Sequence, residues 1–210
     1  MKRVLVIALA LICTFAAQAQ MATLKPISVY KVPNISHATY TNGTYNNEDN
    51  PLFWELHCGP GNFNGDKVVA SSELNSQGTA TYRASNINDW NHETAWVEGV
   101  SGYGIGQWIE FQNFEVEGTF TAIQILNGYV KSDKAWSENA RVKRLKVYCN
   151  GKPICILELQ DSRSLQSFNV NNLLGSVRYI KSLRFEILEV YPGTKYQDTV
   201  IAEIVFSAAS

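Results

Sequence analysis

The sequence predicts an all-β protein, folded as a jelly-roll β-sandwich with an N-terminal extension. Two observations lead to this prediction. From Gly106 onward, short apolar runs of period two alternate with Gly, Asn and Asp, the pattern of strands separated by turns. No segment carries an amphipathic helix longer than two turns. Many short strands within one domain are typical of sandwiches and jelly rolls.

Composition narrows the class of protein further. The chain has 210 residues, of which 45% are hydrophobic and 18% charged, a balance that is typical of folded domains. Its formal net charge is −1, so it lacks the basic field that nucleic-acid binding would need. We therefore expect no nucleic-acid partner.

The first 19 residues are expected to form a secretory signal peptide. Lys2 and Arg3 provide a basic start, and the following run, 4–17, is almost entirely apolar. Ala17-Gln18-Ala19 then matches the small-x-small cleavage pattern. The run is too short for a membrane span, and no other segment approaches one. We expect cleavage after Ala19 and a mature protein that works in the periplasm or outside the cell.

The mature chain divides into two regions. Residues 20–65 differ in composition, since 39–50 are rich in Asn, Thr and Tyr without periodicity and 51–65 are rich in aromatics and Gly. They are interpreted as an N-terminal extension with the capacity to add an edge strand. Residues 66–210 carry the strand pattern and form the predicted jelly-roll domain. In its last strand, Ala202, Ile204 and Phe206 are expected to face the core, so that Glu203 points the other way. The clearest predicted strands are 107–111, 120–126, 144–149, 154–159, 182–190 and 199–206.

Three cysteines remain after cleavage, Cys58, Cys149 and Cys155, so at least one is free or pairs between chains. The turn sequence Asn-Gly-Lys-Pro at 150–153 joins the strands that carry the last two. Strand alternation places both of these sulfurs on one apolar face, where they could lie opposite each other. A cross-strand disulfide and two buried thiols both satisfy this pattern. Two cysteines alone do not close a metal site.

The most informative motif spans residues 84–96. It reads Ala-Ser-Asn-Ile-Asn-Asp-Trp-Asn-His-Glu-Thr-Ala-Trp. It resembles the Asn-x-x-Asp-x-Asn-x-x-Thr-x-Trp signature of discoidin, or coagulation factor 5/8 type C, domains. Segments 97–100, 102–107, 127–129, 139–141 and 191–193 extend the resemblance to the bacterial branch attached to NAD glycohydrolase toxins as a translocation domain. The resemblance covers residues 70–206 and implies a jelly roll of the galactose-binding-like superfold.

Domains with this signature commonly hold one structural calcium ion, and the resemblance implies the same here. Calcium prefers about six to eight hard oxygen ligands. Asp89 offers a carboxylate, Thr94 a hydroxyl and a carbonyl, and Glu203 matches the C-terminal carboxylate that closes the site in the family. The main-chain carbonyls of Asn86 and Asn91 complete the expected metal-binding set. A loop held only by Asx-turns and side-chain caps would use the same residue types.

Aromatic side chains in and beside the predicted loops indicate sugar recognition. An aromatic ring can cover the apolar C–H face of a pyranose, while planar polar groups bind its hydroxyls. The alternative is that each aromatic only packs its loop against the sandwich, and Trp96 fits this best because its counterpart in related domains packs beside the calcium loop. Tyr196 is another loop aromatic. The candidate ligand-binding residues are Glu98, Tyr103, Gln107, Asn127, Tyr129, Lys131, Trp136, Asn139, Arg141 and Tyr191.

The sequence offers little support for catalysis. His37, His57 and His92 lack the context of a placed catalytic histidine, and no carboxylate pair stands out. The resemblance is to an accessory domain and not to a catalytic one. We therefore expect a secreted, non-catalytic module that binds a glycan or glycoconjugate and holds one structural calcium ion. The alternative is a protein-interaction or assembly module with a partner protein at the cell envelope.

Overall fold

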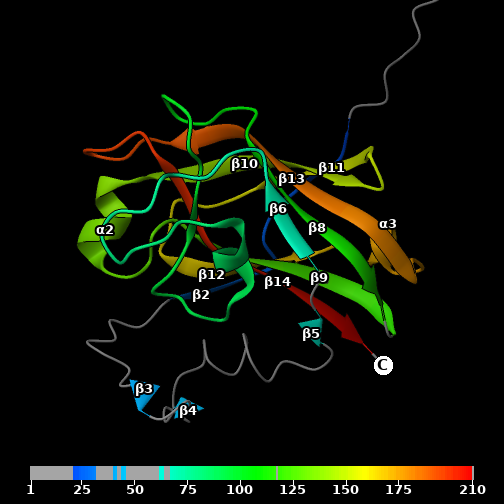
Figure 1. The fold of residues 1–210 in the computed structure, drawn as a ribbon. Coiled ribbons are helices and arrows are strands. Elements are labelled where there is room, and N and C mark those ends of the chain that lie inside the picture. The colour runs from blue at the N-terminus through cyan, green and yellow to red at the C-terminus, as the bar shows by residue number, and fades with distance from the viewer. Residues whose placement is uncertain are drawn as a thin grey trace, which may run out of the picture.

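Two layers of β-strands enclose the core of the protein, as Figure 1 shows. This computed structural model describes residues 21–31, 40–41, 44–45, 62–63, 67–116 and 118–209. The expected signal peptide, Cys58, His37 and His57 lie outside the described residues. Within them, no helix is both long and apolar enough to cross a membrane.

The first layer contains, in spatial order, β6 (Lys67–Ala70), β8 (Trp108–Glu115), β13 (Tyr179–Tyr191), β10 (Ala140–Cys149), β11 (Lys152–Glu158) and β1 (Thr23–Leu24). The second contains β2 (Ser28–Lys31), β12 (Ser164–Asn169), β9 (Thr119–Asn127) and β14 (Thr199–Ala209), and β5 (Asn62–Phe63) and β7 (Trp96–Val97) also pair with β14. The layers join at one corner, because β10 also pairs in parallel with β14. The predicted jelly-roll β-sandwich is confirmed.

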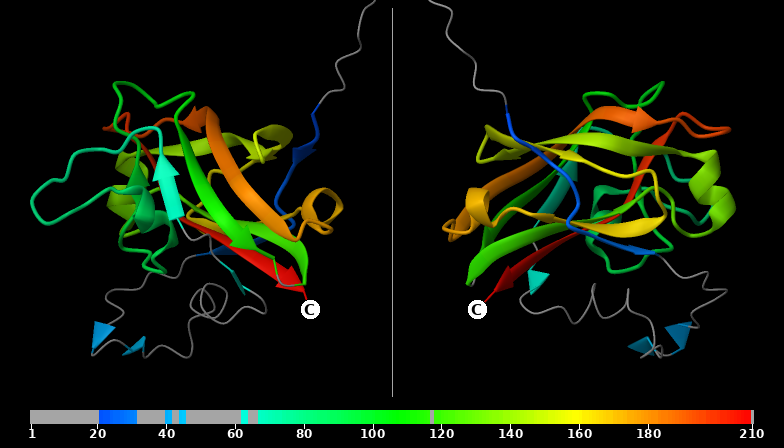
Figure 2. Two further views of the ribbon diagram at one scale, coloured as in Figure 1. Left: turned by 45° about the vertical axis from the view of Figure 1, so that its right-hand side comes forward. Right: turned by 180° about the vertical axis from the view of Figure 1, so that it is seen from behind.

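The short helices lie outside the two layers. They are η2 (Ala84–Asn88), α2 (Asp133–Glu138) and α3 (Asn171–Leu174). The last two lie at opposite ends of the sandwich, as the views in Figures 1 and 2 agree. A separate strand pair is formed by β3 (Tyr40–Thr41) and β4 (Thr44–Tyr45). These two ends of the sandwich are called the α2 end and the α3 end.

Residues 21–31 add an edge strand to each layer. β1 pairs in parallel with β11, with Thr23 opposite Ile156, and β2 pairs antiparallel with β12, with Tyr30 opposite Leu165. Figure 2 shows this segment, in blue, passing from one layer to the other. Part of the region that the sequence separates from the domain is therefore built into the sandwich.

All six strands predicted from the alternation of apolar residues are present; four lie wholly within a longer strand, and the ranges 107–111 and 154–159 each extend one residue beyond β8 and β11. The sequence did not predict β12, because polar residues occupy its buried positions. Gln166 in this strand is fully buried and bonds the main chain of Gln160 through both ends of its amide. These hydrogen bonds offset the cost of burying a polar side chain, so Gln166 can stand at a core position where the sequence pattern calls for an apolar residue.

The core between the layers is dominated by phenylalanine. The rings of Phe111 and Phe206 meet edge to face at a centroid distance of 4.7 Å, and Phe185 stacks on Phe206 at 6.3 Å. All three side chains are fully buried. A second apolar cluster, containing Val97, Leu126, Val200, Ala202 and Val205, is separate from this core. Because β14 contributes to both clusters, both of its faces are buried.

A β-bulge in β14 corrects one detail of the prediction. Ile201 lies opposite Asn127 and Glu203 opposite Leu126, so Ala202 is an extra residue in the ladder. Ile204 and Phe206 face the core as expected, but Ala202 belongs to the second cluster, while Ile201 takes a place in the core. The prediction for Ala202 is wrong because the bulge interrupts the period of two that it assumed.

Cys149 and Cys155 are free thiols. A register shift in the β10–β11 hairpin sets Val147 opposite Cys155 and Cys149 opposite Lys152, so the two cysteines are not cross-strand partners. Burial raises the pKa of both thiols, that of Cys155 to about 12. The sequence left open a cross-strand disulfide or two thiols, and the structure contains two thiols. Cys155 stays protonated and unreactive at neutral pH.

Asn127 ties β9 to β10 near the corner where the layers join. Its side chain is fully buried, its Nδ2 donates to the carbonyl of Val142 at 2.7 Å, and its Oδ1 accepts from the Val142 amide at 3.0 Å. One side chain therefore satisfies both main-chain groups of a buried residue.

We predict that Asn127→Ala lowers the free energy of unfolding by about 2–5 kcal/mol, because it leaves two buried main-chain groups without a partner at about 1–3 kcal/mol each. Urea denaturation of the mature chain measures this. Asn169→Ala is the control, since the exposed Asn169 only accepts a bond from the Asn171 amide. Equal losses in the two variants would contradict the role assigned to Asn127.

Candidate functional site

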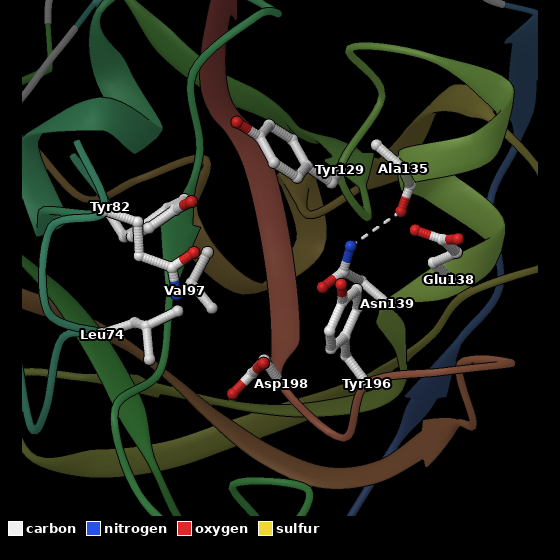
Figure 3. A pocket seen from close by; sticks show the side chains of 10 residues that line it. Leu74, Tyr82, Val97, Tyr129, Ala135, Glu138, Asn139, Tyr196 and Asp198 are labelled. Atoms are coloured by element: carbon white, nitrogen blue, oxygen red, sulfur yellow. Dashed lines mark hydrogen bonds between the residues drawn. The ribbon is translucent and has the colours of Figure 1, made fainter. Parts of the chain in front are cut away.

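A pocket of about 280 Å³ lies at the α2 end of the sandwich (Figure 3). Several separate segments build its wall: the loop after β6, β7, the segment after β9, α2, and the loop before β14. Its volume is close to the lower limit of about 300–1,000 Å³ that is usual for small-ligand sites, which suits a ligand of one ring. The lining residues are Leu74, Gln77, Tyr82, Val97, Tyr129, Ala135, Glu138, Asn139, Tyr196 and Asp198.

Two tyrosines form the aromatic side of the pocket. The rings of Tyr82 and Tyr129 meet edge to face, with centroids 6.4 Å apart, and pack against the second apolar cluster. Among the described residues, neither hydroxyl has a hydrogen-bond partner. Burial, followed by the nearby Tyr82 and Glu93, raises the pKa of Tyr129. Its hydroxyl therefore stays protonated at neutral pH and can donate a hydrogen bond.

Polar groups form the other side. The Asn139 amide donates to the carbonyl of Ala135 at 2.8 Å, which fixes its orientation and leaves its own oxygen as an acceptor (Figure 3). Within the described part of the chain, the Asp198 carboxylate has no side-chain partner. Glu138 has one weak ion pair, with Lys134 at 4.0 Å. The pocket thus places hydrogen-bonding groups opposite two aromatic rings.

Three of the predicted ligand-binding residues form a layer beneath the pocket. Trp136 donates its indole N–H to the carbonyl of Asn127 at 3.1 Å, and the guanidinium of Arg141 lies 4.4 Å from the centre of the Trp136 ring. Gly128, with φ +83°, permits this packing, because a Cβ there would lie 2.8 Å from atoms of Trp136 and Arg141. The sequence Asn127-Gly128 is therefore needed to bring these groups together.

Arg141 is the centre of this supporting layer. It forms a two-pronged ion pair with Asp161, at 2.8 and 3.1 Å, and also donates to the carbonyl of Asn139 at 2.9 Å. Its side chain is only 8% exposed. Such paired guanidinium–carboxylate contacts are geometrically specific, so Arg141 positions Asn139 from below and does not line the pocket.

Five other predicted ligand-binding residues also lie outside the pocket lining. Gln107 accepts hydrogen bonds from Ser71 and Ser72, and the hydroxyl of Tyr191 donates to the carbonyl of Leu159. The remaining three are Glu98, Tyr103 and Lys131. Of the ten candidates, the pocket lining includes Tyr129 and Asn139.

Glu98 is fully buried and braces the Gly-rich loop behind the pocket. Its carboxylate accepts from the amides of Val100, at 2.9 Å, and Thr199, at 3.2 Å. Burial is the largest influence on this carboxyl and raises its pKa, although the two hydrogen bonds oppose the shift. The Thr199 hydroxyl also donates to the carbonyl of Tyr103, so the loop is attached to the start of β14.

Sequence reasoning missed most of the lining, but one signal was available. β9 and β14 are antiparallel neighbours, so the last residues of β9 and the first residues of β14 lie at the same end of the sandwich. This places Tyr129 and Asp198, which flank these strand ends, at one end of the sandwich. Tyr82 lies in a segment without periodicity, and only its position just before the motif at 84–96 marks it.

The motif at 84–96 folds into a tightly bonded loop. The Thr94 hydroxyl donates to the Asp89 carboxylate at 2.7 Å. The main-chain N–H of Asn91 donates to the carboxylates of Asp89, at 3.0 Å, and Glu203, at 2.9 Å. Asn86 joins the two ends of the loop, since its side-chain amide donates to the carbonyls of Thr81 and Ala95. These bonds use the motif residues in the way that Asx-turns and caps do.

Trp96 is part of the core, as expected. It is fully buried, and its indole N–H donates to the carbonyl of Ser72 at 3.0 Å. Trp90, within the loop, has φ +62°, a left-handed conformation that non-glycine residues seldom adopt. The loop therefore holds a bulky residue in a conformation that its surroundings must stabilise.

Glu203 gives the loop a feature that hydrogen bonds alone do not explain. Its side chain is fully buried, and its Oε2 has no partner among the described residues. Burial, followed by the negative charge of Asp89, raises the pKa of Glu203 well above its ordinary value. A buried carboxylate beside the exposed carboxylate of Asp89 is stabilised by a compensating cation or proton.

The donor set fits calcium better than zinc. In the described part of the chain, no three His, Cys, Asp or Glu side chains come together as a metal cluster. Asp89, Glu203 and the Thr94 hydroxyl supply only oxygens, and main-chain carbonyls would have to complete the shell. A few carboxylates with carbonyl and hydroxyl oxygens suit calcium, whereas zinc sites are built from Cys and His.

The fold and the loop define a discoidin-like β-sandwich domain. The family model for the NAD glycohydrolase translocation F5/8 type C domain matches residues 61–207, and the chain belongs to this family. The resemblance found in the sequence is thereby confirmed. A comparison with curated proteins finds no match.

Several solved structures are similar. CpGH89CBM32-5 of Clostridium perfringens, in complex with GalNAc-β-1,3-galactose, is 19% identical with a TM-score of 0.48, over 68% of this chain and 94% of that one. CBM32-3 from a family 31 glycoside hydrolase of the same organism is 16% identical, with a TM-score of 0.47 over 71% and 96%. The C-terminal domain of a Bacteroides fragilis chitobiase is 13% identical, with a TM-score of 0.46 over 70% and 97%.

We predict that Gly104→Ala destabilises the domain more than Gly106→Ala. Both glycines have positive φ, +62° and +85°, so each alanine carries about 1–2 kcal/mol of backbone strain. A Cβ on Gly104 would also lie 2.5 Å from the fixed carboxyl group of Glu98, whereas nothing lies within 4 Å of one on Gly106. Thermal and urea unfolding measure the difference, and equal losses would contradict the packing of Glu98.

Proposed function

We propose that this domain is a secreted, non-catalytic module that binds carbohydrate by holding one sugar residue in the pocket at the α2 end. The observation that carries the proposal is the combination of two tyrosine rings with the Asp198 carboxylate, in a pocket of about 280 Å³; neither the tyrosine hydroxyls nor this carboxylate has a side-chain partner among the described residues. Sugar rings present an apolar C–H face and a polar edge, and this lining matches both.

The lining suggests a role for each group. Tyr82 and Tyr129 would cover the apolar face of the sugar, and their hydroxyls would bond its edge. The fixed Asn139 oxygen and the Asp198 carboxylate would accept from sugar hydroxyls. The 41% exposed ring of Tyr196 would contact the sugar from the rim.

The pocket lining supports a binding role, and the family supports a location outside the cell. The described lining includes no Ser, Cys, Lys or His, so it offers neither a Ser–His nor a Cys–His pair. The family is that of a translocation domain, which supports an exported protein. The supporting layer of Arg141, Trp136 and Asn127 lowers the entropy lost on binding, because it holds the pocket in one shape.

We also propose one structural calcium ion at the loop of residues 84–96. Asp89, Thr94 and Glu203 would hold it together with the carbonyls of Asn86 and Asn91. The ion would neutralise two carboxylates, and the orphaned Glu203 oxygen supports this assignment. Trp90 of this loop and Tyr129 of the pocket pack against the same apolar cluster, so ordering the loop would also order one wall of the pocket.

The family's description favours a second function, that of a protein-interaction module at the cell envelope. A partner protein would then use the same end of the molecule or the sheet faces. The sugar titration described next separates the two functions, because a folded protein that binds no sugar but retains a protein partner supports only the second.

Removing the hydroxyls of the pocket tyrosines should weaken sugar binding. We expect Tyr82→Phe and Tyr129→Phe each to lose about fivefold in affinity, the loss of about one hydrogen bond. Calorimetric or NMR titration of residues 20–210 with a panel of mono- and oligosaccharides measures this. Tyr179→Phe is the control, because Tyr179 lies at the α3 end and is 53% exposed. A folded protein that binds no sugar in the panel would overturn the proposal.

Chelation tests the calcium proposal. We expect EDTA to lower the melting temperature of the wild-type protein, since a ligand at about 100–1,000 times its Kd stabilises by about 3–4 kcal/mol. Asp89→Asn should be less stable in calcium and should lose most of the response to EDTA, whereas Glu115→Gln, far from the loop, should respond like the wild type. An unchanged melting temperature on chelation of the wild type would show that no structural ion is bound.

A further inference from the structure

The pocket is negatively charged. Two of its ten lining residues, Glu138 and Asp198, are acidic, and the described lining includes no Lys or Arg. Two further carboxylates, outside the lining, act on residues of the wall. Glu93 acts electrostatically on Tyr129, and the buried Glu98 interacts with Asp198 in the same way. The charged side chains in the described lining are therefore both negative.

The nearby cations compensate this charge only in part. Arg141 lies beneath the pocket, but its guanidinium is already paired with both oxygens of Asp161. Lys134 and Lys195 are close to Glu138 at the rim, and the ammonium of Lys195 lies 4.7 Å from the centre of the Tyr196 ring. Asp198 has no such partner among the described residues, so it is the uncompensated charge of the pocket.

We infer that the pocket selects uncharged or amine-bearing sugars and rejects acidic sugars such as uronic acids. This inference rests on the proposed function. A sugar carboxylate brought beside Asp198 would lose hydration and would also meet a like charge. Tyr82 and Tyr129 would limit the access of water to the two carboxylates, which strengthens their repulsion. A sugar ammonium would instead pair with Asp198 and with the rim carboxylate of Glu138.

Two matched sugar pairs test the selection with little change in shape. Galactose and galacturonic acid, or glucose and glucuronic acid, differ only at C6, where a CH₂OH group becomes a carboxylate. We expect the acid to bind at least about tenfold more weakly than its neutral partner at low salt. The methyl ester of the acid should recover most of the binding, because it keeps the size of the group without its charge.

Salt and amines provide two independent readouts. Raising the ionic strength from about 0.01 to about 0.5 M should reduce the discrimination, since the screening length falls from about 30 Å to less than 8 Å. Glucosamine should bind more tightly than N-acetylglucosamine, because only glucosamine carries a positive charge at neutral pH.

Asp198→Asn is the decisive variant, because it removes the charge and keeps the shape. The readout is the ratio of neutral to acidic affinity, which does not depend on how the variant changes sugar binding in general. We expect the ratio to fall toward one in Asp198→Asn. Glu115→Gln, an exposed carboxylate at the α3 end, removes the same charge from the whole molecule and should leave the ratio unchanged.

The outcomes separate this inference from the proposal on which it rests. If acidic and neutral sugars bind equally well, and Asp198→Asn changes nothing, the selection is refuted while carbohydrate binding stands. An equal drop of the ratio in Glu115→Gln would assign the effect to net charge and would also refute the role of Asp198. If no sugar of either kind binds to the folded protein, both the function and the selection fail.

Discussion

The contact between the Asn127 side chain and the main chain of Val142 underlies most of the candidate site. It joins β9 to β10 where the two layers meet, and it sets the position of the chain that leaves β9. Gly128 can then admit Trp136 and Arg141 in van der Waals contact, and Arg141 in turn holds Asn139. The polar side of the pocket is in this way connected to the sandwich core, because Asn139 is held by Arg141 and the adjoining chain by Asn127.

The loop of residues 84–96 is attached to β14 through a side chain at a β-bulge. The bulge at Ala202 displaces the ladder of β14 and, in the next position, lets Glu203 reach the Asn91 amide. A buried carboxylate with one unpaired oxygen is unfavourable on its own, so the fold gains stability whenever a cation or a proton reaches it. Bulges often redirect one side chain of a strand, and the position of Glu203 beside the loop of residues 84–96 is an example.

The sequence predicted the fold well and the pocket poorly, for identifiable reasons. Alternation of apolar residues found the strands whose inner faces are hydrophobic, such as the one carrying Leu183, Phe185 and Ile187. It did not find β12, where Gln166 is buried with its own hydrogen bonds.

Residue type identified polar and aromatic candidates for the pocket but could not say which way they face. Asn127 and Arg141 have the chemistry of sugar-binding residues, yet that chemistry serves main-chain and ion-pair contacts inside the protein. The pocket lining combines residues that are distant in sequence, such as Tyr82 and Asp198. Only the order of the strands in the sheets brings these residues together.

The position of residues 21–31 has a practical consequence for the boundaries of the domain. The family match begins at residue 61, but β1 and β2 cover one edge strand in each layer. A fragment cut at the family boundary would uncover the outer edges of β11 and β12, with rows of main-chain donors and acceptors open to other chains. We therefore expect residues 21–31 to protect these two edges from association with other chains, although the described pocket lining includes none of them.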